Sequence, residues 1–427
     1  MQKTNAMPGD LVEVHLTKVI YEGILLEAPS DEKGIVLLKL DSGYNIGLSR
    51  KDILEIKLIK KFEKKEEIFE LQKDKEKPNI AMIITGGTIA SRFDSRTGAV
   101  SPLTNPEQLF KFYPEIFEKV NVVRIEVPFM KWSENMDFKD WQKIAKTAEK
   151  LLNNPEIKGI IITHGTDFLH YTSAALSFFL QNLNKPVVLT YSQRSTDRAS
   201  SDANLNLQCA ALAAISDIAE VMLVGHATTN DNYCYAMPGA KVRKLHSSRR
   251  DAFKVVNGKP FAKIYPDKIE RISDYNVRKK EKTGKTKADV KFEEKVALVK
   301  FYPGQDPKIL DYYLKEKYKG IVIEVAGLGQ VATSGSRKSW IKKLKEIQRR
   351  GIVVCATAQT IYGRLDPYVY SAGREIIETG VIYLEDMLAE TALVKLGWVL
   401  AKAKNKEEIK KLMLTNLAGE LNSRLEE

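Results

Sequence analysis

The stretch IAMIITGGTIAS, residues 80–91, decides the fold class of this chain. A short apolar run that ends in two glycines is typical of a buried parallel strand followed by a sharp turn. Helical patterns at 141–154 and 172–183 alternate with such runs, which predicts an α/β domain with a parallel sheet and right-handed crossovers. The same apolar form recurs at 157–165 (IKGIIITHG), 185–192 (KPVVLTYS) and 218–226 (IAEVMLVGH).

A second unit of the same kind is predicted further along the chain. Its apolar runs begin at residues 296, 320 and 351, and two helices are expected at its end, around 387–400 and 406–417. A polar and basic segment separates the two units. We therefore expect α/β domains over 79–270 and 295–427, joined by a basic linker over 271–294.

The N-terminal residues follow a third pattern. The alternating stretch LVEVHL and the runs VIYEGILLEA and IVLLKLDSGYNIGLS are separated by turn-forming residues. Three or four short strands of this kind predict a small β-barrel domain over 1–56, and the charged segment 57–78 is then a linker. The expected fold class is α/β: a small N-terminal β-barrel followed by a pair of α/β domains with parallel sheets.

Length and composition agree with this division. The chain has 427 residues, 44% of them hydrophobic, whereas a single core rarely grows beyond about 250–300 residues. No apolar run approaches the roughly 20 residues that cross a bilayer, and the first ten residues lack the apolar core of a signal peptide. The cysteines Cys209, Cys234 and Cys355 are odd in number and form no CxxC motif. These features argue against a disulfide framework or a zinc site, so we expect a cytoplasmic protein without a metal.

The chain carries a formal charge of +12, with 67 lysines and arginines against 55 aspartates and glutamates. An excess of this size suggests a polyanionic partner such as nucleic acid. It is equally consistent with an organism whose proteins are all rich in lysine.

The first candidate motif for chemistry is the turn TGGTIAS at 85–91. Substrates of α/β proteins bind at the carboxyl ends of parallel strands, so the hydroxyl of Thr88 would face a bound ligand. Backbone N–H groups after the turn could hold a developing oxyanion. The chain shows neither the Gly-Lys-Ser/Thr of a phosphate loop nor GxGxxG at this turn. The alternative is a structural Gly-Gly turn whose threonine caps a helix.

The second motif, THGTD at 163–167, also ends an apolar strand. It would place the Thr166 hydroxyl and the Asp167 carboxylate at the same sheet edge as Thr88. The alternative is a helix N-cap made by one of these two side chains. His164 is a candidate general base, although a histidine in such a turn is as often a packing residue.

A third candidate is Lys244, within KVRKLHSSRRDAF at 241–253. A lysine beside a hydroxyl acts as a base only where desolvation lowers its pKa from the ordinary value of about 10.4. A neighbouring carboxylate has the opposite effect, so threonine, lysine and aspartate would work as one coupled proton relay. The local sequence does not distinguish Lys244 from Lys241, and the whole stretch could be a basic surface.

Taken together, TGGTIAS and HGTD resemble the L-asparaginase family. The chain is most similar to one subgroup, the D subunits of archaeal glutamyl-tRNA(Gln) amidotransferases. Three features favour this subgroup: the added β domain, Ser-Glu-Asn where asparaginases carry Ser-Gln-Asp, and the segments QRSTDRASSDAN and HSSRRDAF. The resemblance covers roughly 79–420 and continues through SENM at 133–136, PVVLTYSQRSTDRASSDANLNL at 186–207, EDMLAETALVKLGWVL at 385–400 and LMLTNLAGE at 412–420.

The resemblance assigns roles to individual residues. The nucleophilic threonine of the family falls on Thr88, its second threonine and aspartate on Thr166 and Asp167, and its catalytic lysine on Lys244. The implied reaction is a two-step acyl transfer, in which a hydroxyl attacks the amide carbon, ammonia leaves and water releases the acid. Thr166 stays open as an alternative first nucleophile. The residues expected to contact substrate are Gly87, Ser133, Glu134 and Gly165.

One position departs from the family pattern. Related proteins usually carry a tyrosine that helps to activate the nucleophile, in a loop such as DYRTGAV. Here the loop reads DSRTGAV at 94–100, with Ser95 in that place. This implies a slower enzyme, a substitute such as Tyr113 or a partner residue, or a different loop register.

The resemblance also implies partners. Glutamine or asparagine would be hydrolysed on this chain, and the ammonia would pass to an E-type subunit that converts Glu-tRNA(Gln) to Gln-tRNA(Gln). ATP and Mg²⁺ are expected on that partner subunit, and no cofactor is expected on this chain. A homodimer within a heterotetramer is the expected assembly. The alternatives are a free-standing L-asparaginase, against which the β domain and the basic excess argue, and a non-catalytic scaffold, which Ser95 alone favours.

Overall fold

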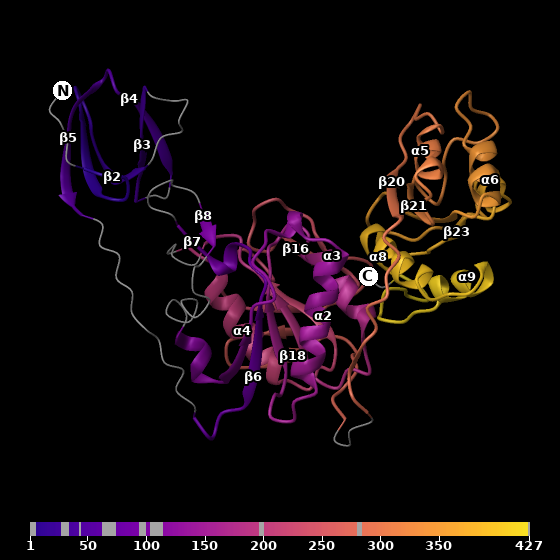
Figure 1. Cartoon of the computed structure of the whole chain (residues 1–427), viewed down its shortest axis with the longest axis horizontal. Coiled ribbons are helices and arrows are strands. Elements are labelled where there is room, and N and C mark those ends of the chain that lie inside the picture. The colour runs from indigo at the N-terminus through magenta and orange to yellow at the C-terminus, as the bar shows by residue number, and fades with distance from the viewer. Residues whose placement is uncertain are drawn as a thin grey trace.

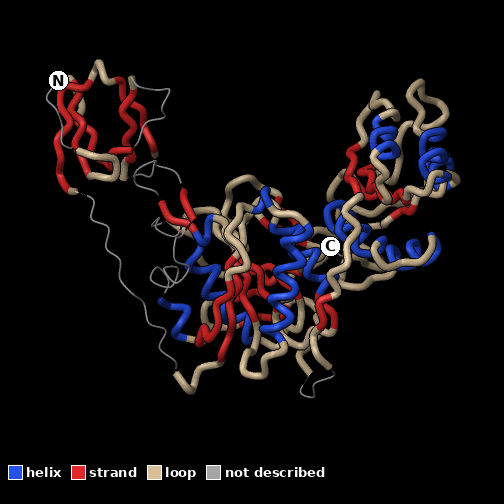
Figure 2. The backbone as a smooth tube through the Cα atoms, viewed as in Figure 1, coloured by secondary structure: helices blue, strands red, loops and turns tan. Residues whose placement is uncertain are grey.

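The computed structural model describes residues 6–26, 34–41, 44–61, 74–93, 100–102, 114–195, 200–279 and 284–425. An N-terminal β domain is followed by two α/β domains (Figures 1 and 2). This is the fold class that the sequence predicts, with the second α/β domain formed by the last part of the chain.

The N-terminal domain is a five-stranded antiparallel sheet with the order β4-β3-β2-β1-β5. Val12, Val14 and Leu38 are completely buried in its core. We expected a small barrel of three or four strands here, and the structure has an antiparallel sheet whose strand order ends at β4 and β5. The strands are β1 (Leu11–Leu16), β2 (Ile20–Leu26), β3 (Ile35–Lys39), β4 (Asn45–Ser49) and β5 (Ile53–Lys60).

The last strand of this domain runs past residue 56, where we expected a linker to begin. In β5, Leu58 pairs with Val12 of β1 and packs against the same core. The charged residues that alternate with it lie on the exposed face of the strand. Charge alone therefore gave the boundary too early, because one face of an antiparallel edge strand tolerates water.

The first α/β domain is built on an eight-stranded sheet with the order β18-β17-β14-β13-β12-β10-β6-β9. One face is covered by α2 (Phe138–Leu152) and α3 (Leu169–Phe179), and the other by α4 (Ala203–Ile215). The parallel strands are β6 (Asn79–Ile84), β9 (Asn121–Glu126), β10 (Ile160–Thr163), β12 (Val187–Thr190) and β13 (Val221–His226). The antiparallel strands are β14 (Cys234–Pro238), β17 (Ala262–Ile264) and β18 (Ile269–Arg271).

The register of the parallel strands brings their carboxyl ends to the same level. Ile84 of β6 lies opposite Thr163 of β10, and Thr163 lies opposite Thr190 of β12. These central strands are buried on both faces, which explains why their sequences are continuous apolar runs. The residues that follow them therefore emerge side by side at one edge of the sheet.

The second α/β domain has a four-stranded parallel sheet with the order β20-β21-β22-β23. In Figure 1, α5 and α6 lie on one side of this sheet, while α8 and α9 lie on the other. The last helix, α9, ends at Leu414 rather than near 417, because Thr415 is extended. The elements are β20 (Val296–Lys300), β21 (Gly320–Val325), β22 (Val353–Ala358), β23 (Ile382–Tyr383), α5 (Ile309–Lys315), α6 (Ile341–Arg349), α7 (Ser371–Ile377), α8 (Ala389–Leu400) and α9 (Lys406–Leu414).

The two α/β domains share one hydrophobic cluster, in which α3 packs against α8. The expected basic linker is fastened to the first domain, since β19 (Lys287–Ala288) pairs with β11 (Leu180–Gln181). Near the C-terminus, Lys395 and Glu420 form a completely buried ion pair at 2.5 Å. In the residues with described positions, no helix combines the length and the apolarity needed to cross a membrane.

Candidate active site

The turn that carries Thr88 can be built only from glycines. Gly86 and Gly87 have φ angles of +114° and +81°, values that favour glycine. A Cβ atom on Gly86 would lie 2.4 Å from the carbonyl oxygen of Lys131, and one on Gly87 would lie 2.3 Å from the backbone nitrogen of Gly165. Thr88 follows directly and begins a short 3₁₀ helix, Thr88–Ala90.

The second motif meets the first at this point. The close approach of Gly87 to Gly165 means that the backbones of the two turns are in direct contact. Thr88 and Thr166 are each the next residue along the chain from that contact. The two glycines therefore allow the candidate hydroxyls to lie at adjacent positions on the carboxyl edge of the sheet.

Lys244 contacts both polar side chains of the second motif. Its Nζ donates a hydrogen bond to Thr166 Oγ1 at 2.8 Å and to Asp167 Oδ1 at 2.7 Å. The Lys244 side chain is only 9% exposed, whereas that of Asp167 is 61% exposed. Lys241, by contrast, is buried elsewhere and pairs with Asp386 at 2.5 Å. The structure thus distinguishes the two lysines that the sequence left equivalent.

A short hairpin holds Lys244 in place. Lys244 ends β15 (Val242–Lys244), which pairs with β16 (Phe253–Val255), and it lies opposite Phe253. The Phe253 ring packs on the ring of Tyr191 with centroids 4.6 Å apart. Tyr191 follows β12, so the hairpin is anchored to the same edge of the sheet as the two threonine turns.

His164, the candidate general base, is a packing residue in this structure. It is completely buried, and burial lowers its pKa from 6.5 to about 4, so its ring is neutral near pH 7. Nδ1 lies 2.7 Å from the Gly165 carbonyl oxygen and Nε2 lies 2.9 Å from Thr172 Oγ1. The carbonyl can only accept, so Nδ1 donates and Nε2 accepts. Both nitrogens are occupied, which favours the structural interpretation.

Ser133 and Glu134 lie on a short 3₁₀ helix, Ser133–Asn135, beside the second turn. Ser133 is buried, and its hydroxyl accepts a hydrogen bond from the backbone N–H of Phe168 at 3.3 Å. A Cβ on Gly165 would lie 3.1 Å from the same hydroxyl oxygen. Glu134 is exposed. A buried hydroxyl therefore lies beside the second turn, and the residue that follows it carries an exposed carboxylate.

A cavity of about 510 Å³ adjoins the Lys244–Asp167 pair. Its wall includes Tyr171 and the ion pair between Arg243 and Glu390, whose atoms are 2.8 Å apart. Glu390 belongs to α8, so the second α/β domain contributes to this wall. A larger cavity, of about 810 Å³, lies at the opposite edge of the sheet, and none of the eight predicted site residues lines it.

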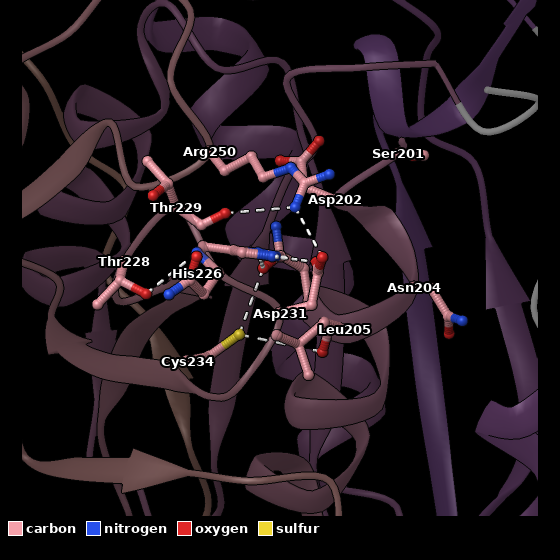
Figure 3. A network of polar contacts seen from close by, with 12 residues as sticks. Ser201, Asp202, Asn204, Leu205, His226, Thr228, Thr229, Asp231, Cys234 and Arg250 are labelled. Carbon is pink, nitrogen blue, oxygen red and sulfur yellow. Dashed lines mark hydrogen bonds and ion pairs between the residues drawn. The ribbon is translucent and has the colours of Figure 1, made fainter. Parts of the chain in front are cut away.

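A polar network around His226, which we did not predict from the sequence, connects to the segment that carries Lys244 (Figure 3). His226 ends β13 and is completely buried. Its Nδ1 lies 2.7 Å from Asn206 Oδ1, and its Nε2 lies 2.9 Å from Asp231 Oδ1. Asn206 Nδ2 donates to the Tyr191 carbonyl at 2.8 Å, which fixes the orientation of the amide. Both nitrogens of the His226 ring therefore lie within hydrogen-bond distance of a side-chain oxygen.

The network extends from His226 to the segment that carries Lys244. Arg250 donates to Asp231 Oδ2 at 2.7 Å and to the Ser200 carbonyl at 2.8 Å. The Tyr191 hydroxyl donates to the Arg250 carbonyl at 2.8 Å. The available sequence signal was that the apolar run at 218–226 ends in a histidine, at the same strand-end position as the other motifs.

Ser95 and Tyr113 lie outside the described residues, so the effect of a serine at position 95 on the enzyme stays a prediction. Within the described ranges, no group of three or more histidine, cysteine, aspartate or glutamate side chains could hold a metal ion.

Two α/β domains with paired threonine turns and a lysine–aspartate pair at one sheet edge are features of the asparaginase class of amidohydrolases. Family models support this class: residues 79–276 match the N-terminal domain of asparaginase, and 295–413 match the glutaminase/asparaginase C-terminal domain. Residues 6–59 match the GatD N-terminal domain. The chain belongs to the family of the D subunits of glutamyl-tRNA(Gln) amidotransferases.

Relatives of that name are similar over almost the whole chain. The protein from Pyrococcus furiosus is 49% identical over 409 residues, which is 95% of this chain and 91% of the relative. The protein from Sulfolobus acidocaldarius is 41% identical over 99% of this chain and 93% of its own length. Among solved structures, the thermostable L-asparaginase from Thermococcus kodakarensis is 29% identical, with a TM-score of 0.71 over 81% of this chain and 100% of that one.

Proposed function

We propose that this chain is the ammonia-releasing subunit of a glutamyl-tRNA(Gln) amidotransferase. It hydrolyses the side-chain amide of glutamine, or of asparagine, with a threonine nucleophile. The ammonia passes to a partner subunit that converts Glu-tRNA(Gln) to Gln-tRNA(Gln). The observation that carries this proposal is the pair of hydrogen bonds from Lys244 Nζ to Thr166 and Asp167, beside the turn of Thr88.

In the first step, the Thr88 hydroxyl oxygen attacks the amide carbon and its proton enters the Thr166–Lys244–Asp167 relay. The tetrahedral intermediate then expels the amide nitrogen, which takes a proton from the relay and leaves as ammonia. In the second step, a water molecule attacks the acyl-enzyme ester and restores the Thr88 hydroxyl. Backbone N–H groups at the Gly86–Gly87 turn are suited to stabilise the oxyanion, a contribution of roughly 3–4 kcal/mol per donor.

The substrate is an amino acid with two charged α-groups. The Ser133 hydroxyl suits the α-carboxylate, and the Glu134 carboxylate suits the α-ammonium. Gly87 and Gly165 bear no side chains, so the two turns can be in contact and the substrate can bind at the sheet edge that they share. ATP and Mg²⁺ belong to the partner subunit in this scheme, and two copies of this chain would join two partner subunits in a heterotetramer.

The proposal is tested by the Thr88→Val variant, with Thr88→Ser as its matched control. Valine removes the hydroxyl and keeps the shape, so ammonia release should fall on the order of 10⁴-fold. Serine keeps a nucleophilic hydroxyl and should retain measurable turnover. Equal ammonia release by the valine variant and the wild type would contradict the assignment and point to Thr166 as the nucleophile.

A second measurement addresses the alternative of a free-standing L-asparaginase. Ammonia release from glutamine and from asparagine is measured with the chain alone, with its partner subunit, and with charged tRNA added. Activity that rises only in the complex supports the amidotransferase. High activity of the chain alone, unchanged by the partner and by tRNA, favours the free enzyme.

A further inference from the structure

The positive charge of the second α/β domain is concentrated in one helix and the residues that flank it. Residues 295–427 contain 22 lysines and arginines against 16 aspartates and glutamates. The segment 337–350, which includes α6, contains 7 of these basic residues and 1 acidic residue. This segment alone therefore accounts for the whole positive excess of the domain.

The arrangement of α6 directs part of this charge into solvent. Ile341, Leu344 and Ile347 are buried against the sheet. Lys342, Lys345 and Arg349 follow one another at spacings of three and four residues, which places them on one face of the helix. We call these three residues the α6 basic face. It extends over about 10 Å, at 1.5 Å per residue.

The cations of the α6 basic face are not neutralised within the protein. Lys338 and Lys343, which border the face, are paired with Asp306 and Asp311 respectively. In contrast, Lys342, Lys345 and Arg349 form no ion pair with any residue for which the structure describes a position. The face therefore offers three unpaired cations with the regular spacing of a helix.

We propose that the α6 basic face binds the phosphate backbone of RNA. The inference rests on the proposed function, which supplies an RNA substrate to the complex. Nucleic acid presents negative charge at short, regular intervals along a strand, and it binds a row of lysine and arginine side chains by releasing counterions. Such contacts position an RNA without reading its sequence.

The other lysine-rich helix of this domain does not have the same property. In α9, Glu407 and Glu408 lie among the lysines, so the charges of its surface are mixed. Mixed signs are what an ordinary soluble surface shows. An acidic protein surface would also attract the α6 basic face. We favour a phosphate backbone because Glu346, the one acidic residue of α6, is paired with Lys343, which leaves three cations of a single sign.

The test compares two triple variants of the full-length chain, each studied alone and with its partner subunit. The first is Lys342→Gln, Lys345→Gln and Arg349→Gln. The matched control is Lys404→Gln, Lys410→Gln and Lys411→Gln, which removes the same charge on the α9 side of the sheet. Binding of a tRNA(Gln) transcript, and of an unrelated RNA of equal length, is measured between about 50 and 300 mM salt, conditions under which phosphate contacts weaken steeply.

The α6 variant should bind both RNAs at least about tenfold more weakly at about 0.1 M salt. The slope of the logarithm of its binding constant against the logarithm of the salt concentration should become shallower by roughly two to three units. The control should bind like the wild type. Equal RNA binding by the α6 variant and the wild type would overturn the proposal, as would equal losses in both variants. Failure of the α6 variant alone to assemble with the partner subunit, with RNA binding intact, would identify a protein interface instead.

Ammonia release is measured in the same samples and keeps the two proposals separable. α6 packs on the face of its sheet opposite to α8, the helix that contacts the first α/β domain (Figure 1), so hydrolysis of glutamine should not change. If neither the wild type nor the variants release ammonia, the proposed function fails, whatever the RNA-binding measurement gives. If ammonia is released normally and RNA binding does not depend on α6, only the present inference fails.

Discussion

His170 is a buried titratable side chain next to the proposed relay, and it gives a prediction about pH. Burial, followed by the charges of Arg243, Lys244 and His164, lowers its pKa from 6.5 to about 3. The ring is neutral in the folded protein but takes up a proton in the unfolded chain below about pH 6.5. Stability from this residue is therefore lost as the pH falls from 6.5 towards 3, by about 2 kcal/mol between pH 7 and pH 5.

The His170→Phe variant isolates this effect. His170 Nδ1 has no hydrogen-bond partner among the described residues, so an apolar ring of similar size should leave the stability at pH 7 unchanged or higher. The free energy of unfolding in urea is measured at pH 7, 6 and 5. We expect the variant to lose about 2 kcal/mol less than the wild type over this range. Identical losses in the two proteins would show that His170 is not held neutral.

At the same scale, the sequence predicts which residue types meet but not every individual residue. Thr88 and Thr166 could be placed together because parallel strands end at one sheet edge. Lys244 could not be separated from Lys241, because the choice depends on a hairpin that turns one lysine towards Thr166 and the other towards Asp386. His164 was left open because only tertiary contacts show that both of its nitrogens are occupied.

Among the elements, the β15–β16 hairpin depends on the network around His226, and this dependence can be tested at Asp231. Asp231 accepts hydrogen bonds from both His226 and Arg250. Partial burial raises the pKa of Asp231, but the hydrogen bonds from His226 and Arg250 outweigh this effect. The net pKa is lowered, so the carboxylate stays charged. Asp231→Ala would leave His226 Nε2 buried without a partner, at a cost of roughly 1–3 kcal/mol.

We expect Asp231→Ala to lower the melting temperature and also the kcat for ammonia release, because Arg250 and the hairpin that positions Lys244 lose an anchor. Asp231→Asn keeps an oxygen acceptor and should lie between the alanine variant and the wild type in both measurements. A lower melting temperature with an unchanged kcat would mean that the network stabilises the fold without positioning Lys244.

The elements that the sequence did not predict are short strands. β14, β17 and β18 extend the first sheet through antiparallel pairs, and β19 pairs with β11 inside the expected linker. These strands are two to five residues long, and β19 pairs with a strand that lies far from it along the chain. A local apolar pattern carries no information about such pairing, whereas the long buried runs of β6, β10, β12 and β13 are decided locally.

For the whole molecule, the fold class of a β-rich N-terminal region followed by α/β domains could be predicted, but the distribution of charge between surfaces could not. The sequence gives the excess of +12 without saying where it lies. Only the fold shows that Ile341, Leu344 and Ile347 turn inwards on α6, and that Lys338 and Lys343 are neutralised by neighbouring aspartates. The composition alone allowed either a polyanionic partner or a lysine-rich organism. The fold makes this choice testable at the α6 basic face, Lys342, Lys345 and Arg349.

The same scale gives a prediction for the N-terminal domain, because its hydrophobic core is separate from the others. Every residue of the cluster around Val12 and Leu38 belongs to residues 6–58, and the α/β pair has its own shared core. A chain that begins at residue 74 should therefore still release ammonia from glutamine. Its melting temperature should stay within about 3 °C of that of the full chain, since roughly 1 kcal/mol of stability corresponds to 2–4 °C in a domain of this size. Thermal unfolding by circular dichroism, with the full chain as control, measures this. A fall of more than about 8 °C would mean that the β domain braces the catalytic domains, and an unchanged melting temperature with weaker binding of the partner subunit would mean that it serves as a contact surface.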